Sequence, residues 1–228
     1  MKPFNVFFIG AVIFALLDWM SAWKGWRIRL YIAKPATLAL LALWTWTVTG
    51  WQNGFIWFGI GLLFALLGDV FLMLSPKFFL PGMAAFFVMQ VSYLIGFNQE
   101  PLEFTLPIAF AAICVGLVAS EVLKYIRPGI SATVKSKRFL IPYIVYFASL
   151  TLMLLSTILC LFRPEWTQSS AWMAAAGGML FFASDSLLSF DRFVKRIPHA
   201  RFWVHLTYHM GQLGIITGVV LHYAGRLN

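Results

Sequence analysis

The chain has 228 residues, of which 61% are hydrophobic and only 11% are charged, and its mean hydropathy is +0.83. A chain this apolar does not stay in water as a globular domain, which excludes a soluble enzyme. The formal net charge of +9 does not indicate a nucleic-acid partner either. The basic residues neither cluster on a soluble face nor alternate with exposed aromatic residues, as nucleic-acid recognition requires.

Apolar runs divide the chain into eight predicted membrane-spanning helices. A helix needs about 20 residues to cross the ~30 Å hydrocarbon core of a bilayer. Runs near that length follow one another with short polar connections between them, at residues 4–23, 35–51, 55–74, 83–98, 105–126, 139–162, 171–190 and 202–224. The sequence therefore predicts an all-α polytopic membrane protein, an eight-helix bundle that forms one membrane domain over residues 1–228.

The basic residues predict the orientation of this bundle. With eight spans, every lysine and arginine except Lys2, Arg163 and Arg226 falls on the same side of the membrane. The positive-inside rule makes that side cytoplasmic and places both termini outside. In a bacterium we expect the inner membrane, because helical bundles rather than barrels occur there.

A weak internal pattern suggests two parallel repeats of four helices, residues 1–104 and 105–228. Asp69 is followed by Gln90 and Tyr93 at offsets of 21 and 24. An aspartate at position 185 is followed by His205 and Tyr208 at offsets of 20 and 23. Repeats of this kind are related by an axis along the membrane normal.

Each helix that runs toward the basic side carries one carboxylate shortly before its end. The four residues are Asp18, Asp69, Glu121 and Asp185. A carboxylate costs about 2.5–3.5 kcal/mol at the centre of a span and less near its end, so these side chains should face the bundle interior or a polar cavity.

These four carboxylates differ in whether a basic residue lies nearby in the sequence. Nearby bases can satisfy the first and third of them, Lys24 and Arg27 for Asp18 and Lys124 for Glu121. Asp69 and Asp185 have no base within one helical turn. Their partners must therefore come from other helices.

The last span adds polar groups at the expected depth of these acids. His205, Tyr208, His209 and Gln212 stand at i, i+3, i+4 and i+7, which places them on one stripe of a helix. Four polar residues on one face, opposite two acids without local partners, indicate a functional cavity near the basic side.

Two chemistries fit such a cavity. One aspartate can be kept protonated while the other stays ionised, and such a pair can protonate a substrate and stabilise an oxocarbenium-like cation. Alternatively, His205 and His209 can join an aspartate to hold a metal that activates water. A proton-coupled transporter of a small or lipid-like substrate also uses buried acids. A membrane protein whose acids only lock helix packing is a further alternative.

Five segments together resemble the YhhN-like integral-membrane lysoplasmalogenases. They are "AKPATLAL" opening the second span, "GDVFLML" in the third, "FFLPGMAAFFVMQVSYLIGF" through the fourth, "GGMLFFASDSLLSFDRF" in the seventh and "YHMGQLGI" in the eighth. The order and spacing carry the resemblance, which covers most of the chain. Two positions depart from the pattern, because Gln90 stands where histidine is expected and Gly211 where alanine is usual.

The resemblance implies hydrolysis of the vinyl-ether bond of lysoplasmalogens to a fatty aldehyde and a glycerophospho-alcohol. It maps the catalytic aspartates onto Asp69 and Asp185, and it implies no cofactor and no metal. The partners implied are a lysophospholipid substrate and membrane lipids. Further residues are expected to orient substrate or water, to form hydrogen bonds or to support the acids: Tyr208, His209, Gln212, Gln90, Tyr93, Lys34 and Asp18.

Overall fold

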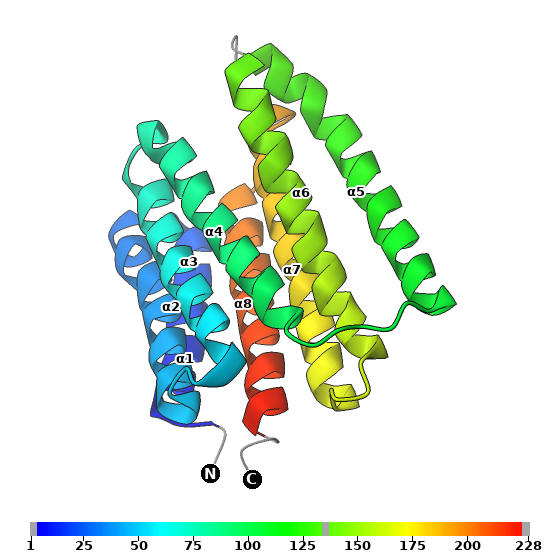
Figure 1. Cartoon of the computed structure of the whole chain (residues 1–228). Helices are drawn as coiled ribbons and strands as arrows, with labels where there is room; N and C mark the ends of the chain where they lie inside the picture. Colours follow the sequence, from blue (N-terminus) through cyan, green and yellow to red (C-terminus); the bar gives the residue numbers. More distant parts are fainter. Residues whose placement is uncertain (1–3, 134–136, 225–228) are drawn as a thin grey trace.

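The computed structural model describes residues 4–133 and 137–224, and within these ranges the chain forms eight α-helices and no strand. Lys2, Lys135 and Arg226, whose charges enter the predicted orientation, lie outside the described residues. The helices form a single elongated bundle (Figure 1). Their bounds are α1 Val6–Lys24, α2 Arg27–Thr49, α3 Ile56–Leu74, α4 Phe79–Phe97, α5 Leu106–Thr133, α6 Lys137–Leu159, α7 Gln168–Phe193 and α8 Ala200–Ala224.

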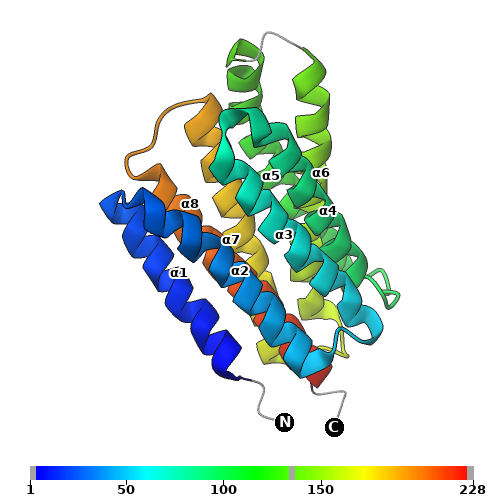
Figure 2. The ribbon, with the colours of Figure 1, turned by 90° about the vertical axis from the view of Figure 1, so that its left-hand side faces the viewer.

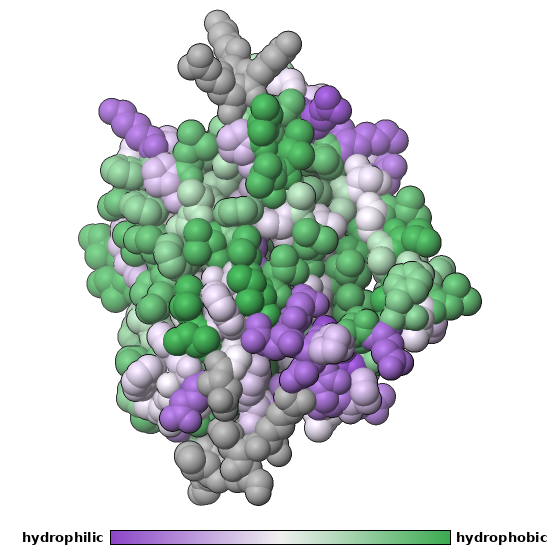
Figure 3. Space-filling model, in the orientation of Figure 1, coloured by the Kyte–Doolittle hydropathy of each residue, from purple (hydrophilic) through white to green (hydrophobic). Residues whose placement is uncertain are grey.

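Seven of the described helices, α1 to α7, are long and apolar enough to cross a membrane. The remaining helix, α8, has 25 residues and packs against α7, α1 and α2 (Figures 1 and 2). Its polar residues Tyr208 and Gln212 form hydrogen bonds with α3 and α4, and His205 forms one with α1. Apolar side chains cover the middle of the visible surface, and hydrophilic ones gather toward its ends (Figure 3). The prediction of an all-α, multi-pass membrane bundle is confirmed.

Helix α1 begins and α8 ends at the same end of the bundle (Figure 1). We call the opposite end the basic end, because lysine and arginine residues lie in or beside the connections that follow α1, α3 and α7. Which side of the membrane it faces stays a prediction, and so does the division of the chain into repeats.

Several helices begin or end outside the predicted apolar runs, and two of them do so by seven residues or more. Helix α2 begins at Arg27 rather than at residue 35, and α5 continues to Thr133 rather than ending at residue 126. Long basic side chains can keep their charge in water while their methylene groups cover apolar surface, so a helix need not end where its apolar run ends. The early start of α2 matters most, because it places Lys34 inside a helix.

Helices α7 and α8 pack with their backbones in contact. A Cβ atom added at Gly177 of α7 would lie 2.3 Å from the backbone nitrogen of Ile215 in α8, and one added at Gly211 would lie 2.8 Å from the backbone nitrogen of Phe181. Small residues allow this close approach of helices in membranes. Toward the basic end, the Ser184 hydroxyl donates a hydrogen bond of 2.9 Å to the carbonyl of Val204. The pair therefore forms a firm support for side chains on both helices.

We expect Gly177→Ala to destabilise the protein, because the added methyl group has no room between the two backbones. Overpacking of this kind costs about 1–3 kcal/mol. Thermal melting of the purified protein in detergent should show a lower apparent Tm. Gly116→Ala in α5 is the matched control, since a Cβ there meets no atom within 4 Å. Equal melting of the two variants would contradict the close α7–α8 contact.

Candidate active site

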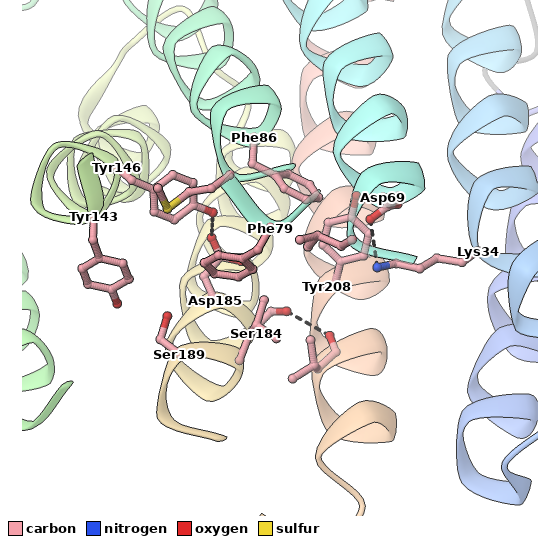
Figure 4. Close-up of a pocket in the computed structure, with 14 residues that line it drawn as sticks. Lys34, Asp69, Phe79, Phe86, Tyr143, Tyr146, Ser184, Asp185, Ser189 and Tyr208 are labelled. Carbon is pink, nitrogen blue, oxygen red and sulfur yellow. Dashed lines mark hydrogen bonds and ion pairs between the residues drawn. The ribbon is translucent and has the colours of Figure 1, made fainter. Parts of the chain in front are cut away.

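Asp69 and Asp185 line the same cavity, which lies inside the bundle toward its basic end (Figure 4). Its volume is about 40 Å³, which is enough for water. Much of the remaining wall is apolar or aromatic and comes from α3, α4, α7 and α8. These side chains are Leu72, Phe79, Met83, Phe86, Leu188 and Val204. The structure thus brings together the two acids that the sequence singled out.

Asp69 is fully buried and takes its partners from two other helices. Lys34 of α2 places its Nζ 2.9 Å from Oδ1 of Asp69, and the Tyr208 hydroxyl of α8 donates a hydrogen bond of 2.9 Å to Oδ2 (Figure 4). The ammonium group also lies 5.1 Å from the centroid of the Tyr208 ring, a cation–π contact. The expectation of partners from other helices is met, and α2, α3 and α8 converge on one carboxylate.

Asp185 has a different environment. The hydroxyl of Tyr146, on α6, donates a hydrogen bond to Oδ2 of Asp185 (Figure 4). Within the described residues no lysine or arginine forms an ion pair with this carboxyl group. One acid of the cavity therefore has a cationic partner, while the other has a neutral hydrogen-bond donor.

The polar residues of α8 form two faces rather than the single stripe that the sequence predicted. Tyr208 points to Asp69, and one turn further on Gln212 accepts a hydrogen bond of 2.8 Å from Tyr93 of α4. His209 instead faces α1. Neighbouring residues of a helix differ in direction by about 100°, so Tyr208 and His209 cannot share one target. His209 and Gln212 do not line the acid cavity.

Asp18 does not pair with Lys24 or Arg27, and that expectation is wrong. Its side chain is fully buried and forms a hydrogen bond of 2.8 Å with Nδ1 of His205. Nδ1 of His209 lies 3.5 Å from the same carboxylate oxygen. The reason is the rotation of α1, which turns Asp18 toward α8 while Lys24 and Arg27 stay exposed.

The remaining polar residues that the sequence singled out lie outside the cavity. Gln90 of α4 accepts a hydrogen bond from the Ser149 hydroxyl of α6 and does not line the cavity. Glu121 and Lys124 form the expected ion pair, with 3.4 Å between the charged atoms. Both of these side chains are well exposed, so this acid belongs to the surface of α5.

Within the part of the chain that the structure describes, no group of three or more His, Cys, Asp or Glu side chains could hold a metal ion. The alternative of a metal held by His205, His209 and an aspartate therefore lacks a ligand set there.

Sequence reasoning missed several polar side chains of the cavity. Tyr143 and Tyr146 of α6 line it, and so do Ser184 and Ser189, which lie close to Asp185 in α7. The tyrosines stand at i and i+3 in the segment "PYIVYF", a spacing that puts both on one face of a helix. This spacing could have identified both tyrosines, because polar groups on one face of an apolar span indicate that a polar group is buried beside that face.

Comparisons with known proteins agree on one family. The YhhN family model matches residues 29–219. The chain is 28% identical to the human protein named lysoplasmalogenase TMEM86B over 152 residues, which are 67% of this chain and 58% of that protein. It therefore spans less than two thirds of the length of the human relative.

Rodent relatives align over more of the chain. The mouse lysoplasmalogenase TMEM86B is 28% identical over 196 residues, 84% of this chain and 75% of that protein. The rat protein of the same name is 27% identical over 212 residues, 91% of this chain and 79% of that protein. No solved structure matches the chain.

We expect Lys34→Met to destabilise the protein strongly, because it leaves the Asp69 carboxylate buried without its cation. Removing one partner of a buried ion pair costs about 3–5 kcal/mol. The double variant Lys34→Met/Asp69→Asn removes both charges and should recover part of the lost thermal stability. Lys124→Met is the control, because an exposed ion pair contributes only about 0–1 kcal/mol. A double variant no more stable than Lys34→Met would contradict the pairing.

Proposed function

The chain belongs to the YhhN family, and we propose that it is a lysoplasmalogenase, an ether hydrolase that cleaves the vinyl-ether bond of lysoplasmalogens. The products are a fatty aldehyde and glycerophosphoethanolamine or glycerophosphocholine. The names of the rodent and human relatives support this activity. The observation that carries the proposal is the pair of carboxyl groups in one cavity, one with a cationic partner and one without.

The cavity lies at a depth suited to such a substrate. Asp69 precedes the end of α3 by five residues and Asp185 precedes the end of α7 by eight, so at 1.5 Å rise per residue they lie about 8–12 Å from the basic end. A lysophospholipid keeps its headgroup at the membrane interface and its chain in the hydrocarbon. Its vinyl ether then lies just below the headgroup, at the level of the two acids.

We assign the two acids different roles from their contacts. Asp69 acts as the carboxylate, because the Lys34 ammonium balances its negative charge in the apolar interior. Asp185 acts as the proton donor, since no cation pairs with it among the described residues and the Tyr146 hydroxyl holds its Oδ2. Dividing duties between an acid and a carboxylate is how glycosidases cleave acetals.

The reaction then follows from general acid–base chemistry. Asp185 transfers its proton to the vinyl carbon farther from oxygen, and the π electrons form the new C–H bond. The resulting oxocarbenium ion is stabilised by the Asp69 carboxylate. Asp69 next removes a proton from water as the water oxygen bonds to the cationic carbon, which gives a hemiacetal.

The second half of the reaction restores both acids. The hemiacetal hydroxyl returns a proton to Asp185 as its oxygen forms the aldehyde C=O bond. The bond from that carbon to the glycerol oxygen breaks, and Asp69 gives its proton to the departing oxygen. One water is consumed, and every proton that is transferred comes from Asp185, Asp69, that water molecule or the hemiacetal.

We expect aldehyde release from 1-alkenyl-lysophosphoethanolamine and its choline analogue by detergent-purified protein, both with and without EDTA. Asp69→Asn and Asp185→Asn should each lower kcat by about 10²–10⁴-fold, because each removes a proton-transfer group. Glu121→Gln is the matched control, since this carboxylate is exposed on α5. Well-folded wild-type protein that releases no aldehyde would contradict the proposal and favour the transporter alternative.

Hydrolysis in D₂O tests the site of protonation. Proton transfer to carbon predicts one deuterium on the carbon next to the aldehyde group. Hydrogens at this carbon exchange through the enol, so unlabelled aldehyde incubated in D₂O without the protein is the control. Hydrolysis in H₂¹⁸O should leave the glycerophospho-alcohol free of ¹⁸O, because water bonds to the vinyl carbon and the glycerol keeps its oxygen. Mass spectrometry measures both labels, and ¹⁸O in the glycerol product would contradict this mechanism.

A further inference from the structure

A second and much larger cavity adjoins the acid cavity at the basic end of the bundle. Its volume is about 640 Å³, within the range of about 300–1,000 Å³ typical of ligand sites. The two cavities share Lys34, Leu72, Leu188 and Val204 in their walls. We call the larger one the basic vestibule; its charged lining residues are Arg27, Lys34, Asp191, Arg192, Arg196 and Arg201.

Positive charge in the basic vestibule exceeds negative charge. Asp191 is matched by Arg196, with 2.9 Å between the charged atoms, and Lys34 is matched by Asp69. Among the described residues, Arg27, Arg192 and Arg201 form no ion pair with a carboxylate. A concave surface lined by unmatched charges of one sign attracts counter-ions, and arginine matches the geometry of phosphate. The vestibule is therefore suited to an anion.

Arg192 joins the basic vestibule to the acid cavity. Its guanidinium carbon lies 3.8 Å from the centroid of the Phe79 ring, and Phe79 lines the acid cavity. The neighbouring Asp191 accepts a hydrogen bond of 2.8 Å from the backbone nitrogen of Ile197. This bond holds the α7–α8 connection, which forms one wall of the vestibule. Positive charge thus lies one aromatic ring away from the acid cavity.

We propose that the basic vestibule binds the phosphate of the lysophospholipid, with Arg27, Arg192 and Arg201 as its contacts. This inference rests on the proposed function and deepens it. In the substrate only the glycerol group separates the phosphate from the vinyl ether, and in the protein only the shared wall around Lys34 separates the two cavities. The protein therefore prefers lipids with a phosphate over ether lipids that end in glycerol.

The competing explanation is that these residues serve only as topology determinants. Lys77 and Lys195 lie at the same basic end, are exposed and do not line the vestibule. A topology determinant acts by its side of the membrane, so it should not matter whether the charge faces the cavity. Lys77 and Lys195 are therefore matched controls for the arginines.

The test measures binding of two uncleavable ligands to the full-length protein in detergent. One is 1-O-alkyl-lysophosphocholine, which carries the phosphate, and the other is 1-O-alkylglycerol, which lacks it. We expect the wild type to bind the first at least about tenfold more tightly, since hydrogen bonds to charged groups are stronger than those between neutral groups. Arg201→Gln and Arg27→Gln should each reduce this preference several-fold, while Lys77→Gln and Lys195→Gln should not.

Two outcomes would overturn the inference: no preference in the wild type, or equal loss in the arginine and lysine variants. Arg201→Lys keeps the charge but not the planar fork, so it should retain only part of the preference if Arg201→Gln fails to fold. Neither ligand has a vinyl ether, so binding is independent of catalysis. Absence of aldehyde release would contradict the proposed function alone, and an unchanged preference would contradict this inference alone.

Discussion

The ion pair between Lys34 and Asp69 is the constraint on which the rest of the site depends. Either charge alone would be costly inside an apolar bundle, so each requires the other at close range. Their 2.9 Å contact fixes α2 against α3, and the hydrogen bond from Tyr208 adds α8. Three helices are thereby held at one depth and one rotation. The early start of α2 is part of the same arrangement, because it carries Lys34 on a helix rather than on a loop.

This pairing also makes the two acids of the cavity unequal. A lysine beside Asp69 favours the carboxylate there, whereas Asp185 meets only the neutral hydroxyl of Tyr146 among its described hydrogen-bond partners. Cleavage of a vinyl ether needs one proton donor and one anion, so unequal acids suit it better than equal ones. The close backbone contact of α7 with α8 keeps Asp185 and Tyr208 on one rigid pair of helices.

Local sequence properties predicted the helices and the two central acids. The lengths of the apolar runs are enough to predict the membrane spans. The absence of a base within one helical turn of Asp69 and Asp185 is enough to predict that their partners lie on other helices. The partner of Asp18 could not be found this way, since a contact with His205 depends on how α1 and α8 rotate against each other. The separate faces of Tyr208 and His209 depend on the same rotation. Tyr146 could have been predicted from the sequence, because its i, i+3 spacing from Tyr143 places both polar groups on one face of α6.

The sizes of the two cavities suggest how a lipid would be accommodated. About 40 Å³ around the acids admits water but not an alkyl chain, whereas the adjoining basic vestibule is as large as a ligand site. In the proposed reaction an alkenyl chain must therefore displace wall residues, and Met83 is a flexible apolar side chain suited to such movement. The ion pair of Asp69 is not part of that movement, because separating it would leave two buried charges unmatched. In the proposed reaction, the charges are thus in place beforehand, and the surface for the chain forms on binding.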